Sequence, residues 1–474
     1  MSNSVQPNYK SLLIQKSFYL FLGKAMPVLI LFLITIIFSR RLSYDEYGTF
    51  QSVWMYANIV NVILSFGLGA VILSTNMAFL LSFIKKNQKI LISFYILLSL
   101  TTLLIFFLFA KNFNAATKFL LIGFIIIQNT IAVVENLLIK QGGEKKAFLI
   151  NFFYSILFFG THLFILFTNY SLAHLIIVVT IISVIKFFII IFFTRVQAGN
   201  VAINDDKNFM KHWAYLGFNE ILGIIAKWID KIFLLYLLTA TDFAIFFNGS
   251  FEIPLFGLLV SVTGNFLLIE ISGNTRLTDK IVSLFRENFN MLSSIVFPLF
   301  FFLFFFREEL FMLVFKNKYQ ASLPVFLISI FVLPIRINNY TVILQCLLQG
   351  NKIMWGSILD ILIAIILMVL LYPKMGTQGI ALSIVISTWF QVVYYLWHSA
   401  SGLHISILRL VPAKKLLIKF FVLLAVYLLL SLLVQNLAIA VKLILAFLIT
   451  TVAVIAGMWN YLKSFFYKNY GMDT

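Results

Sequence analysis

Cysteine is almost absent from this sequence: Cys346 is the only one among 474 residues. A single thiol excludes an internal disulfide and any metal cluster that needs several cysteines. Charged residues are also scarce, at 11% of the chain, and proline occurs only 8 times. A glycine-rich loop ending in lysine, of the kind that cradles phosphate, is missing as well. We therefore expect neither a cofactor nor a metal site.

Residues that could carry out catalysis are few and scattered. The 5 histidines show no spacing typical of a metal or nucleophile site, and the gaps between apolar runs are too short for a separate domain. We therefore predict that the protein is not an enzyme. The histidines are His162, His174, His212, His398 and His404.

Hydrophobic residues dominate what is present. They make up 62% of the chain, 54 of them are phenylalanine, and the mean hydropathy is +1.03. A soluble protein of this length could not remove so much apolar surface from water, so membrane lipid must be the solvent. The net charge of +18 does not indicate nucleic-acid binding, because the basic residues are scattered between apolar runs.

The apolar runs have the length of transmembrane helices. A helix needs about 20 apolar residues to cross a bilayer, and this spacing predicts about fourteen segments. Alternate gaps lie on opposite sides of the membrane. Lysine and arginine are more frequent in the gaps on the same side as the N-terminus, which predicts that both termini are cytoplasmic. The segments are 18–38, 52–73, 90–110, 118–138, 148–167, 172–194, 213–238, 243–271, 289–306, 321–345, 355–371, 379–397, 416–434 and 438–459.

Two short patterns indicate an internal repeat. The sequence EYGTF at 46–50 returns as DFAIF at 242–246, each at the entry to an even-numbered segment. KQG at 140–142 returns as LQG at 348–350. We interpret them as parallel repeats and predict an N-terminal lobe with helices one to six (1–200), a C-terminal lobe with helices seven to twelve (201–400), and two further helices with a tail (401–474). Transporters of this design place their substrate site between the lobes.

The seventh segment carries four charges on one stripe. Glu220, Lys227, Asp230 and Lys231 share a helical face, which a span surrounded by lipid would not tolerate. Two interpretations remain open: the stripe lines a hydrated cavity, or it forms a buried ion pair that locks the helix to its neighbours. We expect Lys227 to pair with a neighbour on this stripe.

Other polar residues lie inside the apolar segments. Lys24 precedes Pro27 in the first segment, and Asn58 and Asn61 share a face of the second, where they could line a cavity or bond to a neighbouring helix. Arg336 lies near the centre of the tenth segment. We interpret it as a residue that binds an anion, because a lone charge at this depth is costly. Charges nearer the cytoplasmic ends are interpreted as structural, because they can reach the interface or loop charges. They are Glu135, Lys186, Glu270 and Asp360.

Taken together, the deep charges predict a basic cavity that favours an anionic solute. Its cations outnumber its acids, and we expect Arg40 and Arg41 at its outer rim. The expected cations are Lys24, Lys227, Lys231 and Arg336, and the expected sites of ion coupling are Asp230, Glu252 and Glu220.

Several stretches resemble the polysaccharide transporters of the multidrug/oligosaccharidyl-lipid/polysaccharide exporter (MOP) superfamily, in particular the Wzx-type flippases. The stretches are SRRLSYDEYGTF at 39–50, WIDK at 228–231, YQAS at 319–322, LQGNK at 348–352 and YPKMGTQGIA at 372–381. At 231 this chain has lysine where the family usually has arginine. The resemblance covers essentially the whole chain.

The resemblance implies a flippase of the bacterial inner membrane. Such a protein moves undecaprenyl-pyrophosphate-linked oligosaccharide to the periplasmic leaflet by alternating access, for O-antigen or capsule assembly. Helices one, two, seven and eight would surround its cavity, and protons or the membrane potential would act through Asp230 or Glu252. A polysaccharide polymerase and a chain-length regulator are the partners it implies.

Two alternatives stay open at this point. A multidrug or cation exporter of the same superfamily would need an acidic or aromatic cavity. A membrane-embedded polymerase or ligase would normally carry a large periplasmic loop, and the sequence has no such loop.

Overall fold

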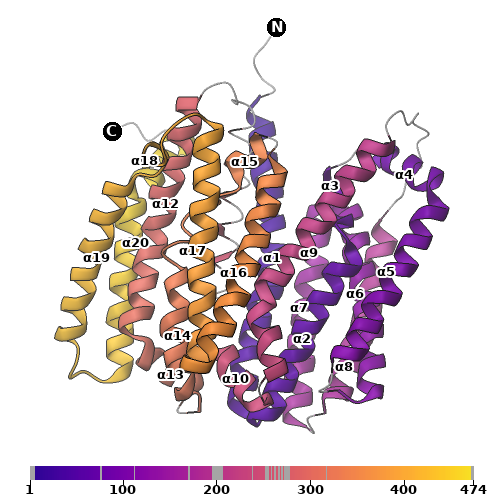
Figure 1. Cartoon of the computed structure of the whole chain (residues 1–474), viewed down its shortest axis with the longest axis horizontal. Helices are drawn as coiled ribbons and strands as arrows, with labels where there is room; N and C mark the ends of the chain where they lie inside the picture. Colours follow the sequence, from indigo (N-terminus) through magenta and orange to yellow (C-terminus); the bar gives the residue numbers. More distant parts are fainter. Residues whose placement is uncertain are drawn as a thin grey trace. The chain divides into compact units, whose positions relative to one another are not determined.

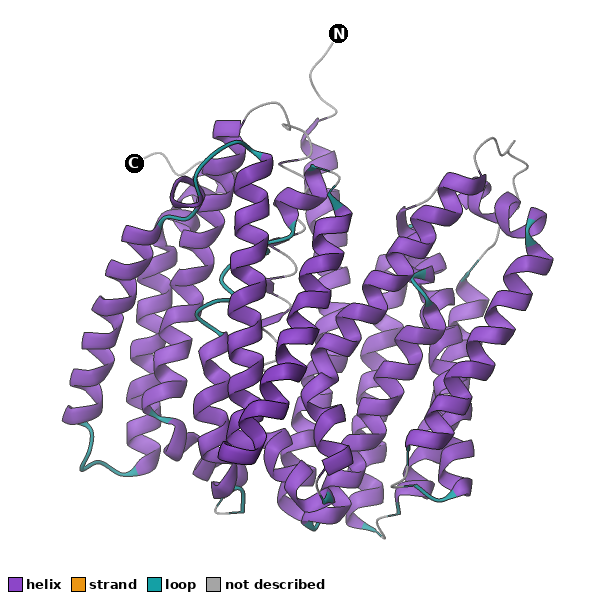
Figure 2. Cartoon of the chain, in the orientation of Figure 1, coloured by secondary structure: helices purple, strands orange, loops and turns teal. Residues whose placement is uncertain are grey.

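A computed structural model describes residues 6–470, apart from 75–76, 111–112, 169–170, 195–205, 238, most of 251–277, 317 and 348. All regular secondary structure in this part of the chain is helical (Figure 2). The predicted all-helical membrane fold is therefore confirmed. The chain forms two compact units, Met1–Trp228 and Ile229–Thr474. The predicted grouping into lobes of 1–200 and 201–400 with a separate 401–474 stays a prediction.

The first unit is a bundle of helices in which α1 packs along α7, α6 packs along α8, and α2 packs against α6 (Figure 1). These contacts bring together segments that are far apart in the sequence, and they build the walls of the site described below. The helices are α1 (Gln6–Arg41), α2 (Tyr44–Ser65), α3 (Leu68–Ser74), α4 (Met77–Lys86), α5 (Gln88–Phe109), α6 (Ala115–Lys140), α7 (Glu144–Phe167), α8 (Leu172–Phe193) and the first part of α9 (Asp206–Leu237).

In the second unit α16 and α17 form a closely packed pair, and α12 packs against both α19 and α20 (Figure 1). Its helices are α10 (Ala240–Gly249), α12 (Thr278–Phe305), α13 (Arg307–Phe315), α14 (Leu323–Ser329), α15 (Val342–Cys346), α16 (Gly350–Met375), α17 (Thr377–Gly402), α18 (Ile407–Leu410), α19 (Ala413–Leu433) and α20 (Ile439–Tyr470), with 3₁₀ turns at Gln320–Ser322 and Ile330–Val332.

The outer helices have the surface of lipid-facing spans. Phe192 on α8 and Leu433 on α19 are each 80% exposed, and both lie among many other exposed apolar side chains. Such continuous apolar surface is rare on soluble proteins and typical of contact with a membrane. In the described part of the chain, 8 helices are long and apolar enough to cross a bilayer. A pair bent by 81°, Phe79–Lys86 and Gln88–Leu104, would add one more.

Two predicted segments are interrupted. The second, 52–73, breaks between α2 and α3, where Phe66 and Gly67 have φ angles of 39° and 73°. The tenth, 321–345, is divided into α14, a 3₁₀ turn and α15, with non-helical backbone around Arg336. Pro334 accounts for the second interruption, because proline cannot donate the hydrogen bond that a continuous helix needs. The prediction of one continuous helix is wrong in both places.

The repeated pattern at 46–50 and 242–246 has a structural explanation. Ser43 caps α2 by accepting a hydrogen bond from the Glu46 N–H, and the Glu46 carboxylate accepts one from the Ser43 N–H at 2.9 Å. Thr239 caps α10 by accepting from the Asp242 N–H at 3.2 Å. The acid in each copy is therefore the third residue of a capped helix. The aromatic residues in the two copies are buried; they are Tyr47, Phe50, Phe243 and Phe246.

Removing one of these caps has a predictable cost. We expect Ser43→Ala to destabilise the protein by about 1 kcal/mol, because the first turn of α2 loses a partner for its free N–H groups. Thermal unfolding in detergent measures the change. Ser171→Ala is the matched control, because Ser171 precedes α8 without making a side-chain cap. Equal effects of the two substitutions would show that the cap contributes nothing.

Candidate functional site

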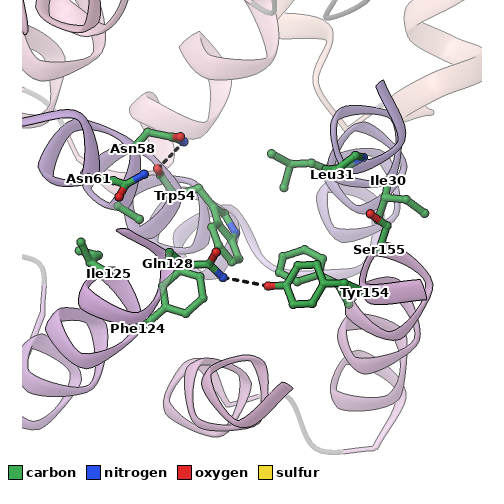
Figure 3. Close-up of a pocket in the computed structure, with 13 residues that line it drawn as sticks. Ile30, Leu31, Trp54, Asn58, Asn61, Phe124, Ile125, Gln128, Tyr154 and Ser155 are labelled. Carbon is green, nitrogen blue, oxygen red and sulfur yellow. Dashed lines mark hydrogen bonds between the residues drawn. The ribbon is translucent and has the colours of Figure 1, made fainter. Parts of the chain in front are cut away.

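A cavity of about 260 Å³ lies within the first unit, between α1, α2, α6 and α7 (Figure 3). Its walls combine apolar and aromatic side chains with polar ones, and none of the described residues that line it is charged. Figure 3 shows the four helices contributing separate walls: Ile30 and Leu31 from α1, Trp54, Asn58 and Asn61 from α2, Phe124, Ile125 and Gln128 from α6, and Tyr154 and Ser155 from α7.

The predicted polar face of the second segment lines this cavity. Asn58 donates a hydrogen bond to the Trp54 carbonyl oxygen at 2.8 Å, and its side chain remains exposed. Asn61 accepts a hydrogen bond from the Asn129 amide of α6 at 3.1 Å. The two interpretations of this face therefore apply to different residues. Asn61 joins neighbouring helices, whereas Asn58 is available inside the cavity.

Two buried polar atoms on the cavity walls have no hydrogen-bond partner among the described residues. They are the indole nitrogen of Trp54 and the hydroxyl of Ser155, whose residue is only 1% exposed. Both residues line the cavity, on α2 and α7 respectively. Unpartnered buried polar groups are rare in native proteins, because each one loses its hydrogen bonds to water without replacement. Neither residue was among those selected from the sequence.

A hydrogen-bond network fixes another part of the wall. The Gln128 side-chain amide donates to the Tyr154 hydroxyl and to the Ser183 hydroxyl, both at 2.9 Å. The Tyr154 and Ser183 hydroxyls are themselves 3.0 Å apart. This network holds α6, α7 and α8 together and leaves the Gln128 carbonyl oxygen as an acceptor.

A buried ion pair adjoins this network. The Lys186 ammonium on α8 lies 3.4 Å from the Glu135 carboxylate on α6 and 4.6 Å from the centre of the Tyr154 ring. Asn151 on α7 donates to the same carboxylate at 2.7 Å. The expectation that these charges reach the interface or loop charges is wrong, because they neutralise each other inside the bundle. The predicted structural role of both residues remains the best account of them.

The four charges of the seventh segment, on α9, have three different environments. Lys231 pairs with Asp230 at 2.8 Å, and both residues are buried. Lys227 is exposed, and its ammonium lies 5.6 Å from the centre of the Trp228 ring. The expectation that Lys227 pairs along the stripe is therefore wrong, because Lys231 is the partner of Asp230. This pair is within one helix, so it does not by itself lock α9 to a neighbour.

Glu220, the fourth residue of the stripe, lies at the break between α2 and α3. Its carboxylate accepts hydrogen bonds from the Gly67 N–H at 3.2 Å and from the Ser65 hydroxyl at 3.4 Å. Trp213, two turns earlier on α9, donates to the Phe66 carbonyl oxygen at 2.9 Å. The Glu220 carboxylate thus accepts hydrogen bonds at the break, where the hydrogen-bond pattern of α2 ends. Its predicted role in ion coupling stays a prediction.

Arg336 lies in the interruption of the tenth segment, and its side chain is exposed. Its charge acts on the carboxylate of Asp360 on α16, which also interacts with the Ser387 hydroxyl on α17. Asp360 was interpreted as a structural residue near the cytoplasmic end. The structure adds Arg336 as its neighbour, although the two are far apart in the sequence.

The remaining predicted site residues are placed as follows. The side chain of Lys24 and all of Glu252 lie outside the described residues. Arg40 and Arg41 are exposed in the last turn of α1, and the Arg41 guanidinium lies 5.1 Å from the centre of the Phe167 ring. Their position at a cavity rim stays a prediction. Of the four cations expected in a basic cavity, Lys227 and Arg336 are exposed, and Lys231 is neutralised by Asp230.

The fold is similar to that of solved transporters. The lipid II flippase MurJ, in its inward closed conformation, matches with a TM-score of 0.67 at 15% identity over 95% of this chain and 100% of that chain. A MATE transporter in complex with MaL6 matches with a TM-score of 0.58 at 14% identity over 83% and 97% of the two chains. A MOP superfamily transporter from Pyrococcus furiosus matches with a TM-score of 0.57 at 15% identity over 84% and 97%.

No protein-family model matches the sequence, and no curated protein matches it. At identities near 15% the similarity concerns the fold alone. The chain is therefore a multi-pass membrane protein with the fold of MOP superfamily transporters. Its solute has to be inferred from its own residues.

Proposed function

We propose that this protein is a flippase for lipid-linked oligosaccharides, with an undecaprenyl-pyrophosphate carrier and a role in O-antigen or capsule assembly. It works in the bacterial inner membrane with both termini in the cytoplasm, by alternating access. It binds and moves its solute without making or breaking covalent bonds. A polysaccharide polymerase and a chain-length regulator are the proposed partners.

The observation that carries this proposal is the exposure of Lys227 and Arg336. Lys227 lies in the middle of the seventh segment and Arg336 near the middle of the tenth. A cation at this depth is costly unless it faces water or an anion. A pyrophosphate group that crosses the membrane needs cations for the same reason, because it cannot enter hydrocarbon unpaired. Two exposed cations at membrane depth therefore suit an anionic head group.

The experiment is complementation of a strain that accumulates lipid-linked repeat units on the cytoplasmic face. We expect Lys227→Gln and Arg336→Gln each to lower the appearance of repeat units outside about tenfold, the effect of losing a hydrogen bond to a charged group. The matched control is Lys145→Gln, because Lys145 is exposed near the beginning of α7. Full complementation by the Lys227→Gln/Arg336→Gln double variant would rule out the anion-binding role.

Ion coupling is part of the same proposal. Asp230 is the first candidate, and Glu220 is a further one within the described residues; Asp230 is buried, and its carboxylate lies 2.8 Å from the Lys231 ammonium. Glu252 is the second candidate. We expect Asp230→Asn to weaken the dependence of flipping on an imposed proton gradient, measured in proteoliposomes, while substrate binding remains. An unchanged gradient dependence would assign the coupling elsewhere.

A further inference from the structure

We propose that the uncharged cavity between α1, α2, α6 and α7 binds one neutral sugar ring of the transported head group, separately from the pyrophosphate. This inference rests on the proposed function and names the part of the substrate that the cavity recognises. Its volume of about 260 Å³ lies just below the range of about 300–1,000 Å³ typical of small-molecule pockets. A cavity of this size accommodates a monosaccharide and excludes a whole oligosaccharide.

The cavity offers hydrogen-bonding groups of both kinds. The indole N–H of Trp54 is an unused donor, and the Ser155 hydroxyl can both donate and accept. The side-chain carbonyl oxygens of Asn58 and Gln128 accept no hydrogen bond from the described residues, whereas the amide nitrogens of both side chains donate. Sugar hydroxyls donate and accept at once, so one ring can satisfy this mixed set.

The walls between these polar groups are flat and apolar. Trp54 and Phe124 contribute aromatic rings, and Ile30 and Leu31 lie across the cavity from them (Figure 3); Phe158 adds a third ring to the lining. A pyranose ring has apolar C–H faces and a polar rim, which suits aromatic surfaces edged by hydrogen-bonding groups. The Gln128–Tyr154–Ser183 network holds one wall in place, so the site is formed before the ligand arrives.

The charge of the described lining residues distinguishes a neutral ligand from an anionic or a cationic one. A phosphate would need a cation there, and a cationic drug would need a carboxylate, but none of the lining residues that the structure describes has either. The nearby Glu135 and Lys186 neutralise each other. A neutral, hydroxyl-rich ligand therefore fits better than the pyrophosphate or a lipophilic cation.

The experiment compares two ligands on the purified full-length protein in nanodiscs. One is a polyprenyl pyrophosphate that carries a single sugar, and the other is the same lipid without sugar. We expect the sugar to strengthen binding about tenfold in the wild type, the effect of the hydrogen bonds it gains. Trp54→Phe and Ser155→Ala should each reduce this preference severalfold. Lys227→Gln should weaken both lipids equally and leave the ratio unchanged.

The controls separate this inference from the proposed function. Trp389→Phe removes the indole N–H of a tryptophan that is 52% exposed on α17 and should leave the ratio unchanged. Thermal melting shows that each variant is folded. A wild-type ratio near one, or a ratio that Trp54→Phe and Ser155→Ala do not change, overturns the sugar site even if both lipids bind and are flipped.

If neither lipid binds, the proposed function is contradicted. A second measurement then tests the sugar site without any lipid. A soluble monosaccharide carrying a photoreactive diazirine is cross-linked to the protein, and the labelled peptides are identified by mass spectrometry. Labelling at 54–61 and 154–158 that free sugar competes away, and that Trp54→Phe reduces, supports the sugar site. Labelling elsewhere, or competition by a lipophilic cation instead of sugar, overturns it.

Discussion

Replacing Lys186 by methionine is expected to destabilise the first unit by about 1–3 kcal/mol, the cost of leaving the half-buried Glu135 carboxylate without its charge partner. Lys186 is 8% exposed, and its ammonium lies 3.4 Å from the Glu135 carboxylate. Without it, the Glu135 carboxylate keeps only the hydrogen bond from Asn151 and has no cation beside it in an apolar bundle. Unfolding of the purified protein in increasing SDS, followed by circular dichroism, measures the change.

The double variant distinguishes loss of a charge partner from loss of packing. In Glu135→Gln/Lys186→Met the remaining amide is neutral, so most of the lost stability should return. Lys145→Met is the control, because it removes an exposed lysine of the same unit and should change stability by less than about 0.5 kcal/mol. If the double variant is as unstable as Lys186→Met, the defect comes from packing and not from an unpaired carboxylate.

The fold class could be predicted because it depends on local properties. Apolar runs of about 20 residues identify spans wherever they occur. The pattern at 46–50 and its copy at 242–246 could be recognised because an acid, an aromatic residue and a phenylalanine recur at the same spacing. The sequence does not show what the repeated acid does, whereas the structure places it in the first turn of a capped helix in both copies.

The cavity could be predicted only in part. Asn58 and Asn61 were selected because their spacing places them on one face of a helix. Trp54, Gln128 and Ser155 were not selected, although Trp54 lies one turn before Asn58 on the same face of α2. They form a site because α1 packs along α7 and α2 packs against α6. Such contacts are not encoded in the periodicity of any one helix.

Charge pairing was the least predictable feature. Counting deep cations and acids predicted a basic cavity, but a count does not show which charges are already neutralised. Asp230 neutralises Lys231 on the same helix, and Glu135 neutralises Lys186 across two helices. Lys227 and Arg336 are the described members of the expected set that remain exposed. The two proposals together assign the sugar to the cavity in the first unit and the pyrophosphate to these exposed cations.

Replacing Gly67 by alanine is expected to destabilise the protein by about 2–5 kcal/mol and to abolish complementation. Gly67 has a φ angle of 73°, which costs about 1–2 kcal/mol for a residue with a side chain. A Cβ at this position would lie 2.7 Å from the backbone nitrogen of Gly217 on α9, and overpacking of this kind costs about 1–3 kcal/mol. Because the clashing atom belongs to the backbone of α9, no side-chain rotation can relieve the clash. The substitution therefore forces α9 away from the break between α2 and α3.

This movement would also separate the groups that hold the break together. Glu220 would leave the Gly67 N–H, and Trp213 would leave the Phe66 carbonyl oxygen, whose residue already has a φ angle of 39°. The control is Gly160→Ala on α7, where a Cβ meets nothing within 4 Å and alanine favours the helix. It should melt at the wild-type temperature or slightly above. If Gly67→Ala has the same melting temperature as Gly160→Ala and still complements, the break between α2 and α3 tolerates displacement. The contact of Glu220 with the break would then be unimportant, and its predicted role in ion coupling would be the remaining explanation for this residue.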